Sequence, residues 1–219
     1  MPVKLTYFNL RGLAEPTRYM LHIAGVEYED HRYPIDVAAG FKRPEFDADQ
    51  AKGVFDMNMG RIPLLEVDGQ VIGQSRPIAR FVARKYGFMG DNDIEAAQVD
   101  AAFEHVKDIV DAYQKPRSIT DEAAKKEAID KWFSTELPTW YGKLEKSIAL
   151  TSKKDGCSVG SKISLADIGI YYLAIFFFDD KELNKAAWEK HPKVKAVVEA
   201  VANHPKVKEW EAKRPNTVM

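Results

Sequence analysis

The spacing of hydrophobic and polar positions predicts a strand, a helix and a second strand at the start of the chain. Apolar side chains recur at every second position over residues 3–8, which is the period of a strand. A helical pattern follows from about Ala14 and ends at Gly25, a residue suited to a left-handed C-terminal position, and an extended pattern resumes over 28–32. Elements of these lengths most economically form a right-handed crossover between parallel strands.

A hairpin and a helix complete the first part of the chain. The extended runs 63–67 and 70–72 flank Asp68-Gly69, a dipeptide suited to a tight turn whose central residues need positive φ. A helical pattern then covers about 76–86. The order β-α-β, followed by β-β-α, predicts a thioredoxin-like domain of the α+β class over residues 1–86.

The second half predicts an all-α domain over residues 94–219. Helical periods dominate from about Ile94 onward, and the stretch 87–92 reads as a linker because it is rich in Gly, Asp and Asn. The sequence His-Pro-Lys-Val-Lys occurs at His191 and again at His204. Since each histidine precedes a proline suited to the first helical turn, we interpret the pair as two helix starts and expect no metal site.

Composition excludes several classes of function. The chain has 219 residues and a net charge of −1, which supplies no field for collecting nucleic acid or an anionic membrane. The longest wholly apolar stretch, 171–178, is far shorter than the roughly 20 residues of a bilayer span, and the N-terminus lacks a signal-peptide pattern. Cys157 is the single cysteine, so no intrachain disulfide can form. We therefore expect a cytoplasmic globular protein.

Tyr7 is the first candidate for chemistry because it lies where the first strand gives way to a helix. Gly12 can turn the chain there, and the following residues 14–16 suit a first helical turn. Ligands of α/β layers bind at the carboxyl ends of strands. A lone tyrosine at such a place is more often a half-buried residue with a satisfied hydroxyl, so the interpretation depends on further motifs.

Two further motifs converge on the same edge of the predicted sheet. Ile62-Pro63 opens a strand, where a cis proline would turn the main chain of Ile62 outward to pair with an extended peptide. Gln74-Ser75 stands at a helix N-terminus, where unpaired N–H groups and the helix dipole favour a carboxylate. The combination is typical of a site for the amino-acid head of a small anionic peptide.

With these motifs in place, the chain resembles the cytosolic glutathione transferases nearly from end to end. Residues 7–15 resemble the catalytic tyrosine segment of the tyrosine-dependent classes, and 60–69 with Gln74-Ser75 resembles the glutathione-binding strand and turn. Ser164-Leu-Ala-Asp167 resembles the family's helical capping box, and the ending 203–215 is similar to its terminal helix. The likeness is greatest to the sigma class, with a mu-like segment after the tyrosine.

The resemblance implies that Tyr7 activates glutathione, which is a co-substrate, and no cofactor is expected. A thiol with a pKa near 8.5 is mostly protonated at neutral pH, so lowering its pKa by about two units needs about 3 kcal/mol of preferential stabilisation of the thiolate. Tyrosine, with a reference pKa of about 10, stays protonated and can donate a hydrogen bond to sulfur. The implied reaction is attack of this thiolate on hydrophobic electrophiles.

The resemblance also assigns glutathione contacts. Besides Tyr7, it implies contacts with Arg61, Ile62, Pro63, Gln74 and Ser75. The segment 35–58 is longer than the usual sigma-class loop and lacks its tryptophan, so the contact to the glycyl carboxylate stays open among residues that include Lys42 and Arg43. Leu13 stands where sigma and alpha chains carry an arginine, which leaves Arg11 as the nearby positive charge.

A homodimer with an apolar substrate pocket is also implied by the resemblance. Asp108, on the helix after the linker, would reach the neighbour's glutathione amine, although an ordinary solvated helix charge is an equal interpretation. The hydrophobic substrate pocket is expected at Phe8, Leu13, Val110 and Tyr113, with the helical domain contributing to it.

Other functions remain open at this point. A sigma-like chain can use the same thiolate to isomerise prostaglandin H, and the sequence does not separate this activity from conjugation. A crystallin-like member would keep the fold and bind ligands without catalysis, but the retained Tyr7, Pro63, Gln74 and Ser75 favour an enzyme. A disulfide oxidoreductase would need a reactive cysteine near the first helix, and Cys157 lies in the other half.

Overall fold

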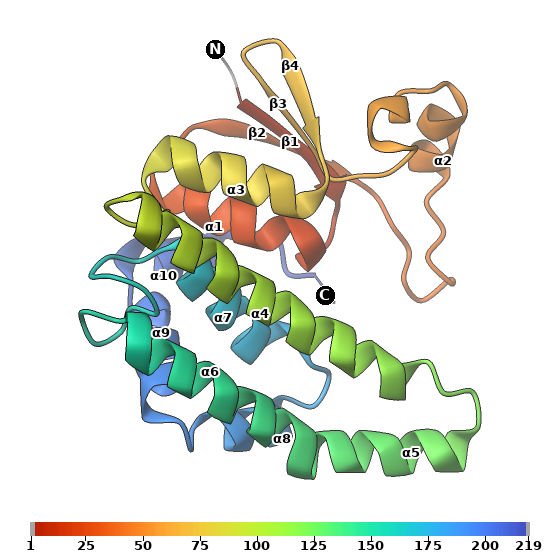
Figure 1. Cartoon of the computed structure of the whole chain (residues 1–219). Helices are drawn as coiled ribbons and strands as arrows, with labels where there is room; N and C mark the ends of the chain where they lie inside the picture. Colours follow the sequence, from red (N-terminus) through yellow and green to blue (C-terminus); the bar gives the residue numbers. More distant parts are fainter. Residues whose placement is uncertain (1–2, 218–219) are drawn as a thin grey trace. The chain divides into compact units, whose positions relative to one another are not determined.

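The computed structural model describes residues 3–217, which divide into two compact units (Figure 1). The first unit holds the N-terminal 86 residues together with the chain from Pro205 onward, and the second holds Gly87–His204. The last helix therefore belongs to the first unit, whereas the sequence grouped it with the helical domain. Within residues 3–217, no helix has the length and apolar character needed to cross a bilayer.

A four-stranded sheet with the strand order β2-β1-β3-β4 forms the base of the first unit. β1 (Val3–Phe8) pairs in parallel with β2 (Tyr28–Tyr33) and antiparallel with β3 (Leu64–Val67). β3 forms a hairpin with β4 (Gln70–Gly73). The thioredoxin-like arrangement expected from the sequence, including the parallel first pair and the hairpin, is confirmed.

The helices of the first unit bring the end of β1 close to the C-terminal helix. α1 (Glu15–Ile23) packs against α3 (Ser75–Tyr86), and both lie on the same side of the sheet in Figure 1. α10 (Pro205–Lys213) packs against α1. α2 (Pro44–Ala51) lies in the long connection between β2 and β3. The core of this unit includes Tyr19, Met20 and Leu21 of α1, none of which is exposed.

The second unit is all helical, as expected from the sequence. α4 (Asp93–Arg117) packs against α7 (Leu165–Tyr172), whose residues are buried except for the last one. Two segments, Trp132–Glu136 and Leu173–Phe177, adopt π-helical turns. The remaining helices of the unit are α5 (Glu122–Lys131), α6 (Leu137–Thr151), α8 (Lys181–Trp188) and α9 (Pro192–Ala202). α9 and α10 begin directly after His191 and His204, which are therefore helix starts.

A complete capping box begins the central helix α7. The Ser164 hydroxyl oxygen accepts a hydrogen bond from the Asp167 N–H at 3.4 Å, and the Ser164 N–H donates to Asp167 Oδ2 at 2.7 Å. The Ser164 hydroxyl also donates to the same oxygen, and the Ser158 N–H donates to the other oxygen of Asp167 at 2.5 Å. Asp167 is fully buried, so these donors replace the water that its carboxylate loses on folding.

We expect Ser164→Ala to lower the free energy of unfolding by about 1–3 kcal/mol, because the change removes a helix cap and leaves buried polar groups unpaired. Ser161→Ala is the matched control, since Ser161 is exposed and three residues away, and its effect should stay below about 0.5 kcal/mol. Chemical denaturation followed by circular dichroism measures both changes. Equal effects of the two substitutions would contradict the structural role of the cap.

Candidate active site

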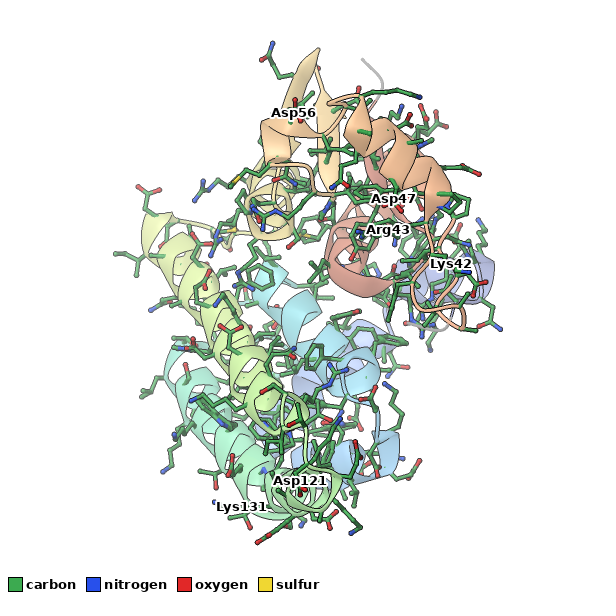
Figure 2. All side chains as sticks on the ribbon, turned by 90° about the vertical axis from the view of Figure 1, so that its right-hand side faces the viewer. Lys42, Arg43, Asp47, Asp56, Asp121 and Lys131 are labelled. Carbon is green, nitrogen blue, oxygen red and sulfur yellow. The ribbon has the colours of Figure 1, made fainter. Side chains whose placement is uncertain are left out.

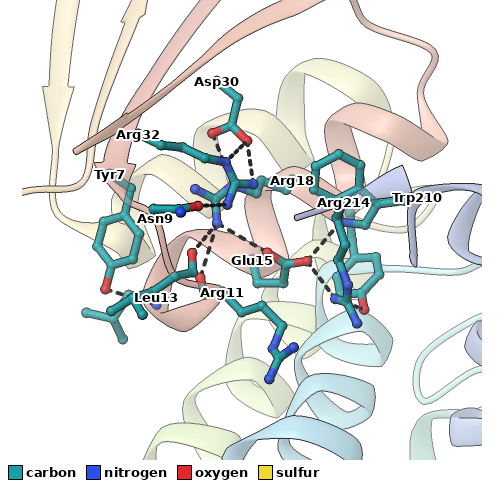
Figure 3. A network of polar contacts seen from close by, with 12 residues as sticks. Tyr7, Asn9, Arg11, Leu13, Glu15, Arg18, Asp30, Arg32, Trp210 and Arg214 are labelled. Carbon is teal, nitrogen blue, oxygen red and sulfur yellow. Dashed lines mark hydrogen bonds and ion pairs between the residues drawn. The ribbon is translucent and has the colours of Figure 1, made fainter. Parts of the chain in front are cut away.

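The turn after β1 brings the backbone of Leu13 to the Tyr7 hydroxyl. Tyr7 is 7% exposed, and its oxygen accepts a hydrogen bond from the Leu13 N–H at 3.3 Å (Figure 3). The short 3-10 turn Gly12–Ala14 carries that N–H into the start of α1. Because the phenolic oxygen accepts this bond, the phenolic O–H can still donate to a ligand.

Gly12 is required at this turn by two observations. Its φ is +43°, a conformation that side chains disfavour. A Cβ at this position would lie 2.8 Å from the Tyr7 Oη atom. The sequence indicated that Gly12 turns the chain, whereas its close approach to the phenol is visible only in the structure.

The Tyr7 phenol is protonated at neutral pH. Burial raises the pKa of Tyr7 above its ordinary value of 10.0, while the Leu13 N–H and the positive charge of Arg18 act in the opposite direction. The Arg18 Cζ atom lies 5.9 Å from the centroid of the Tyr7 ring. A protonated phenol can donate a hydrogen bond to an anionic ligand without transferring its proton.

Asn58 holds the chain around Ile62 and Pro63, whose peptide bond is cis. Its buried side-chain amide donates to the Arg61 carbonyl at 2.8 Å and to the Pro63 carbonyl at 3.2 Å. Among the described residues, Ile62 itself makes no backbone hydrogen bond, so its N–H and C=O are available to an extended ligand. The sequence analysis missed Asn58, because nothing in the local pattern indicates which carbonyls its amide reaches.

Gln74 and Ser75 mark the start of α3. Gln74 is exposed and has a φ of +69° where β4 ends, and Ser75 is the half-buried first residue of the helix. The first-turn N–H groups of a helix point away from it and favour an anion. Arg61 is exposed, and its guanidinium lies 3.5 Å from the sulfur of Met59.

Lys42 and Arg43 lie side by side in the segment before α2 (Figure 2), but their charges have different partners. Arg43 pairs with Asp47 at 3.1 Å, and its Cζ atom lies 4.8 Å from the centroid of the Phe46 ring. Lys42 is exposed, and no carboxylate of the described residues forms an ion pair with it. Lys52, another basic residue of this segment, pairs with Asp49 at 2.9 Å. Of these three cations, Lys42 is therefore the one available to a ligand.

A cavity of about 650 Å³ opens beside the turn after β1. Its walls are Asn9 and Leu10, the segment 34–38 after β2, Lys42 with Pro44, and Asn216 with Thr217 near the C-terminus. Phe8 and Leu13 are not part of this lining: Phe8 packs its ring 4.9 Å from that of Phe46, and Leu13 is 61% exposed. The sequence analysis did not identify Leu10, segment 34–38 or the C-terminal residues, because only the fold brings them together.

The second unit carries the other predicted residues on α4. Asp108 is exposed, and one of its carboxylate oxygens lies 3.9 Å from the His105 ring nitrogen Nδ1. Val110 is half-buried, whereas Tyr113 is 2% exposed and packs its ring against Trp132, Phe133 and Phe178. Tyr113 also lines a cavity of about 390 Å³ formed by residues of this unit.

Two family models of the glutathione S-transferases match this chain. Residues 3–84 match the model described as "Glutathione S-transferase, N-terminal domain", and residues 103–214 match "Glutathione S-transferase, C-terminal domain". Glutathione S-transferase 3 of Caenorhabditis elegans is 33% identical over 98% of this chain and 97% of its own length.

The chain is also similar to relatives with different names and to solved structures. Hematopoietic prostaglandin D synthase of Gallus gallus is 31% identical over 99% of this chain and 98% of its own, and S-crystallin SL11 of Nototodarus sloanii is 29% identical over 97% of each chain. The crystal structure of a monomeric glutathione S-transferase from Necator americanus has a TM-score of 0.79 and 30% identity, covering both chains completely.

The family models together span most of the chain. The N-terminal model covers the thioredoxin-like part, and the C-terminal model covers most of the helical unit together with α10, which packs in the first unit. The chain therefore belongs to the glutathione S-transferase family, and it is a glutathione transferase.

Proposed function

We propose that Tyr7 stabilises the thiolate of bound glutathione, which then attacks a hydrophobic electrophile. The observation that carries this proposal is the state of the Tyr7 phenol, which is buried, protonated and held by the Leu13 N–H with its own proton available. A hydrogen bond from that proton to sulfur stabilises the thiolate more than the thiol and so lowers the thiol pKa. The sulfur then forms the new bond to the electrophile.

Three groups of the first unit would orient the tripeptide. The N–H and C=O of Ile62 would pair with the cysteinyl backbone, as a short antiparallel strand does. Gln74 and the start of α3 at Ser75 would bind the γ-glutamyl carboxylate. Lys42 would bind the glycyl carboxylate, since its ammonium lacks an ion-pair partner within residues 3–217 whereas Arg43 and Lys52 are paired.

The electrophile would occupy apolar surface near the Tyr7 hydroxyl. The cavity beside the turn is one candidate, because its lining includes Leu10, Ile35 and Val37, although Tyr7 itself does not line it. Phe8, Leu13, Val110 and Tyr113 do not line this cavity, and they remain the residues that the sequence proposes for binding the hydrophobic substrate. We also propose a sigma-like class and a cytoplasmic location, the latter because the one cysteine, Cys157, is buried and unable to form an intrachain disulfide.

Isomerisation of a prostaglandin endoperoxide is the second candidate, because one relative is named hematopoietic prostaglandin D synthase. It would use the same thiolate, so Tyr7 serves both reactions. A noncatalytic role is the third, given a relative named S-crystallin SL11. Retention on immobilised glutathione, followed by assays with chlorodinitrobenzene and with prostaglandin H, separates the three: conjugation, isomerisation, or binding without turnover.

We expect Tyr7→Phe to raise the pKa of bound glutathione by about two units and to lower kcat/KM with chlorodinitrobenzene about 100-fold, because one donor to the anion is lost. The pKa is measured from the ultraviolet absorbance of the thiolate as a function of pH. Tyr28→Phe is the matched control, since the Tyr28 hydroxyl is buried without a hydrogen-bond partner among the described residues. Unchanged thiol pKa and turnover in Tyr7→Phe would remove Tyr7 from the mechanism.

We expect Gly12→Ala to lower kcat/KM about tenfold and to raise the pKa of the bound thiol by about one unit, because the new methyl group displaces the Tyr7 hydroxyl. Gly25→Ala separates this clash from backbone strain. Gly25 also has positive φ, at +67°, but a Cβ there would meet nothing within 4 Å. If both substitutions reduced activity equally, strain and not the contact with Tyr7 would be the cause.

We further propose a homodimer in which Asp108 of one subunit binds the glutathione amine in the other. Asp108 is exposed, so its carboxylate is accessible to a partner. Asp108→Asn should then raise the KM for glutathione about fivefold, the loss of a solvent-exposed charge pair of about 1 kcal/mol, without lowering kcat. Light scattering coupled to size exclusion gives the mass of the particle. A monomer with an unchanged KM in the variant would refute the cross-subunit contact.

A further inference from the structure

A buried network of charged side chains contacts the turn that carries the Leu13 N–H (Figure 3). Arg18 and Glu15, both on α1, are completely buried. The Arg18 Nη1 atom donates to Glu15 Oε2 at 3.2 Å, and the Arg18 Nε atom donates to Asp30 on β2 at 3.1 Å. A buried guanidinium needs several such acceptors, because it has lost its water.

The same guanidinium holds the turn itself. Arg18 Nη1 donates to the Leu10 carbonyl at 2.7 Å and lies 3.3 Å from the Arg11 carbonyl. These carbonyls precede Gly12 and Leu13, so their positions determine where the Leu13 N–H points. Arg32, which also binds Asp30, reaches the side-chain oxygen of Asn9 in the same segment at 3.4 Å.

The C-terminal helix supplies the other half of the network. The Glu15 Oε1 atom accepts hydrogen bonds from Trp210 Nε1 at 2.8 Å and from Arg214 Nη1 at 2.7 Å. Arg214 also donates to the Tyr19 hydroxyl at 2.9 Å, and that hydroxyl donates to Glu211 at 2.5 Å. One oxygen of Glu15 therefore accepts from Trp210 and Arg214, and the other accepts from Arg18. Trp210 and Arg214 lie 195 and 199 residues from Glu15 in the sequence.

We propose that Arg18 and Glu15 are positioning residues for Tyr7, and that Trp210 of α10 and Arg214 directly after it hold them in place. The network fixes the Leu10 and Arg11 carbonyls, these carbonyls orient the Leu13 N–H, and the Leu13 N–H orients the Tyr7 hydroxyl toward the sulfur. The proposal rests on the proposed function of Tyr7. It adds that residues at the far end of the chain set how strongly the bound thiolate is stabilised.

The alternative is that the network contributes only to stability. A structural role predicts that its loss lowers the melting temperature while the folded fraction keeps the thiol pKa of the parent. A positioning role predicts a change in the thiol pKa and in kcat, with little change in the KM for glutathione, because Ile62, Gln74 and Ser75 are not members of the network. The pKa of the bound thiol therefore distinguishes the two roles, because a loss of stability alone does not change it.

The test is a double-mutant cycle between Arg18→Lys and Tyr7→Phe, with Trp210→Phe as a milder third variant. Lysine keeps the charge of Arg18 but cannot make the same set of bonds to Asp30, Glu15 and the two carbonyls. Phenylalanine at 210 removes the donor to Glu15 and keeps an aromatic ring. Each protein is assayed over a range of glutathione concentrations up to saturation, which gives kcat and the KM for glutathione. The pH dependence of thiolate absorbance is measured at saturating glutathione, and the melting temperature is measured separately.

We expect Arg18→Lys to raise the pKa of the bound thiol by about one unit and to lower kcat about tenfold, with Trp210→Phe giving about a threefold effect in the same direction. In the Tyr7→Phe background, Arg18→Lys should change kcat less than about twofold and the thiol pKa by less than about 0.3 unit, because Arg18 acts through Tyr7. Lys213→Gln is the control on α10, since Lys213 is exposed and its ammonium bonds to Glu209 alone among the described residues, and it should leave all four readouts unchanged.

Three outcomes would overturn the proposal. An unchanged thiol pKa in both Arg18→Lys and Trp210→Phe would assign the network to stability alone, while the role of Tyr7 stands if Tyr7→Phe still raises that pKa. An equal effect of Arg18→Lys with and without the Tyr7 hydroxyl would show action by another route. If Tyr7→Phe itself left the thiol pKa unchanged, the proposed function would fail and this proposal with it. Should Arg18→Lys not fold, Trp210→Phe decides by the same criteria.

Discussion

The contact between the Leu13 N–H and the Tyr7 hydroxyl is the constraint on which the site depends. It consumes one acceptor position of the phenol and leaves the proton for a ligand. The contact exists because Gly12 has no Cβ, since any side chain at this point would meet the phenol oxygen. A site with this geometry can stabilise a bound anion without a charged catalytic side chain, which suits a chain in which Leu13 stands where related classes carry an arginine.

Most of the other contacts of the proposed glutathione site use main-chain groups, which the fold already holds in position. Asn58 occupies the carbonyls on both sides of Ile62, so the unpaired N–H and C=O of Ile62 are held in a defined position. The start of α3 offers N–H groups that no residue within the helix can bind. Lys42 adds a side-chain charge that lacks an ion-pair partner in the described chain. A peptide ligand is thereby recognised mainly by its backbone and its carboxylates.

Buried charge explains why the C-terminal helix belongs to the first unit. Taking an ionised side chain out of water costs several kcal/mol unless hydrogen bonds replace the water. Glu15 and Arg18 are fully buried in the first turns of α1, and two of the donors that Glu15 needs come from Trp210 of α10 and from Arg214 directly after it. Packing of α10 on α1 therefore satisfies the polar interior beside the turn after β1. In α7 the same requirement is met locally, because the capping box satisfies Asp167 within the segment 158–167.

The sequence alone determined the order of the strands and flanking helices of the first 86 residues, apart from α2, and the helical character of the rest. The strand and helix periods, the Asp68-Gly69 turn and the His-Pro helix starts are local signals, whereas α2 lies in a segment that the sequence analysis treated as a loop. It also identified Tyr7, Ile62-Pro63, Gln74-Ser75 and the capping box as motifs, since each is defined by residues close together in the chain. Only the tertiary structure decided that Gly12 touches the phenol, that Asn58 holds the Ile62 segment and that Trp210 and Arg214 bind Glu15. These relations join residues that are distant in sequence or depend on side-chain direction, and a hydrogen bond between such partners is set by packing, which no local pattern records.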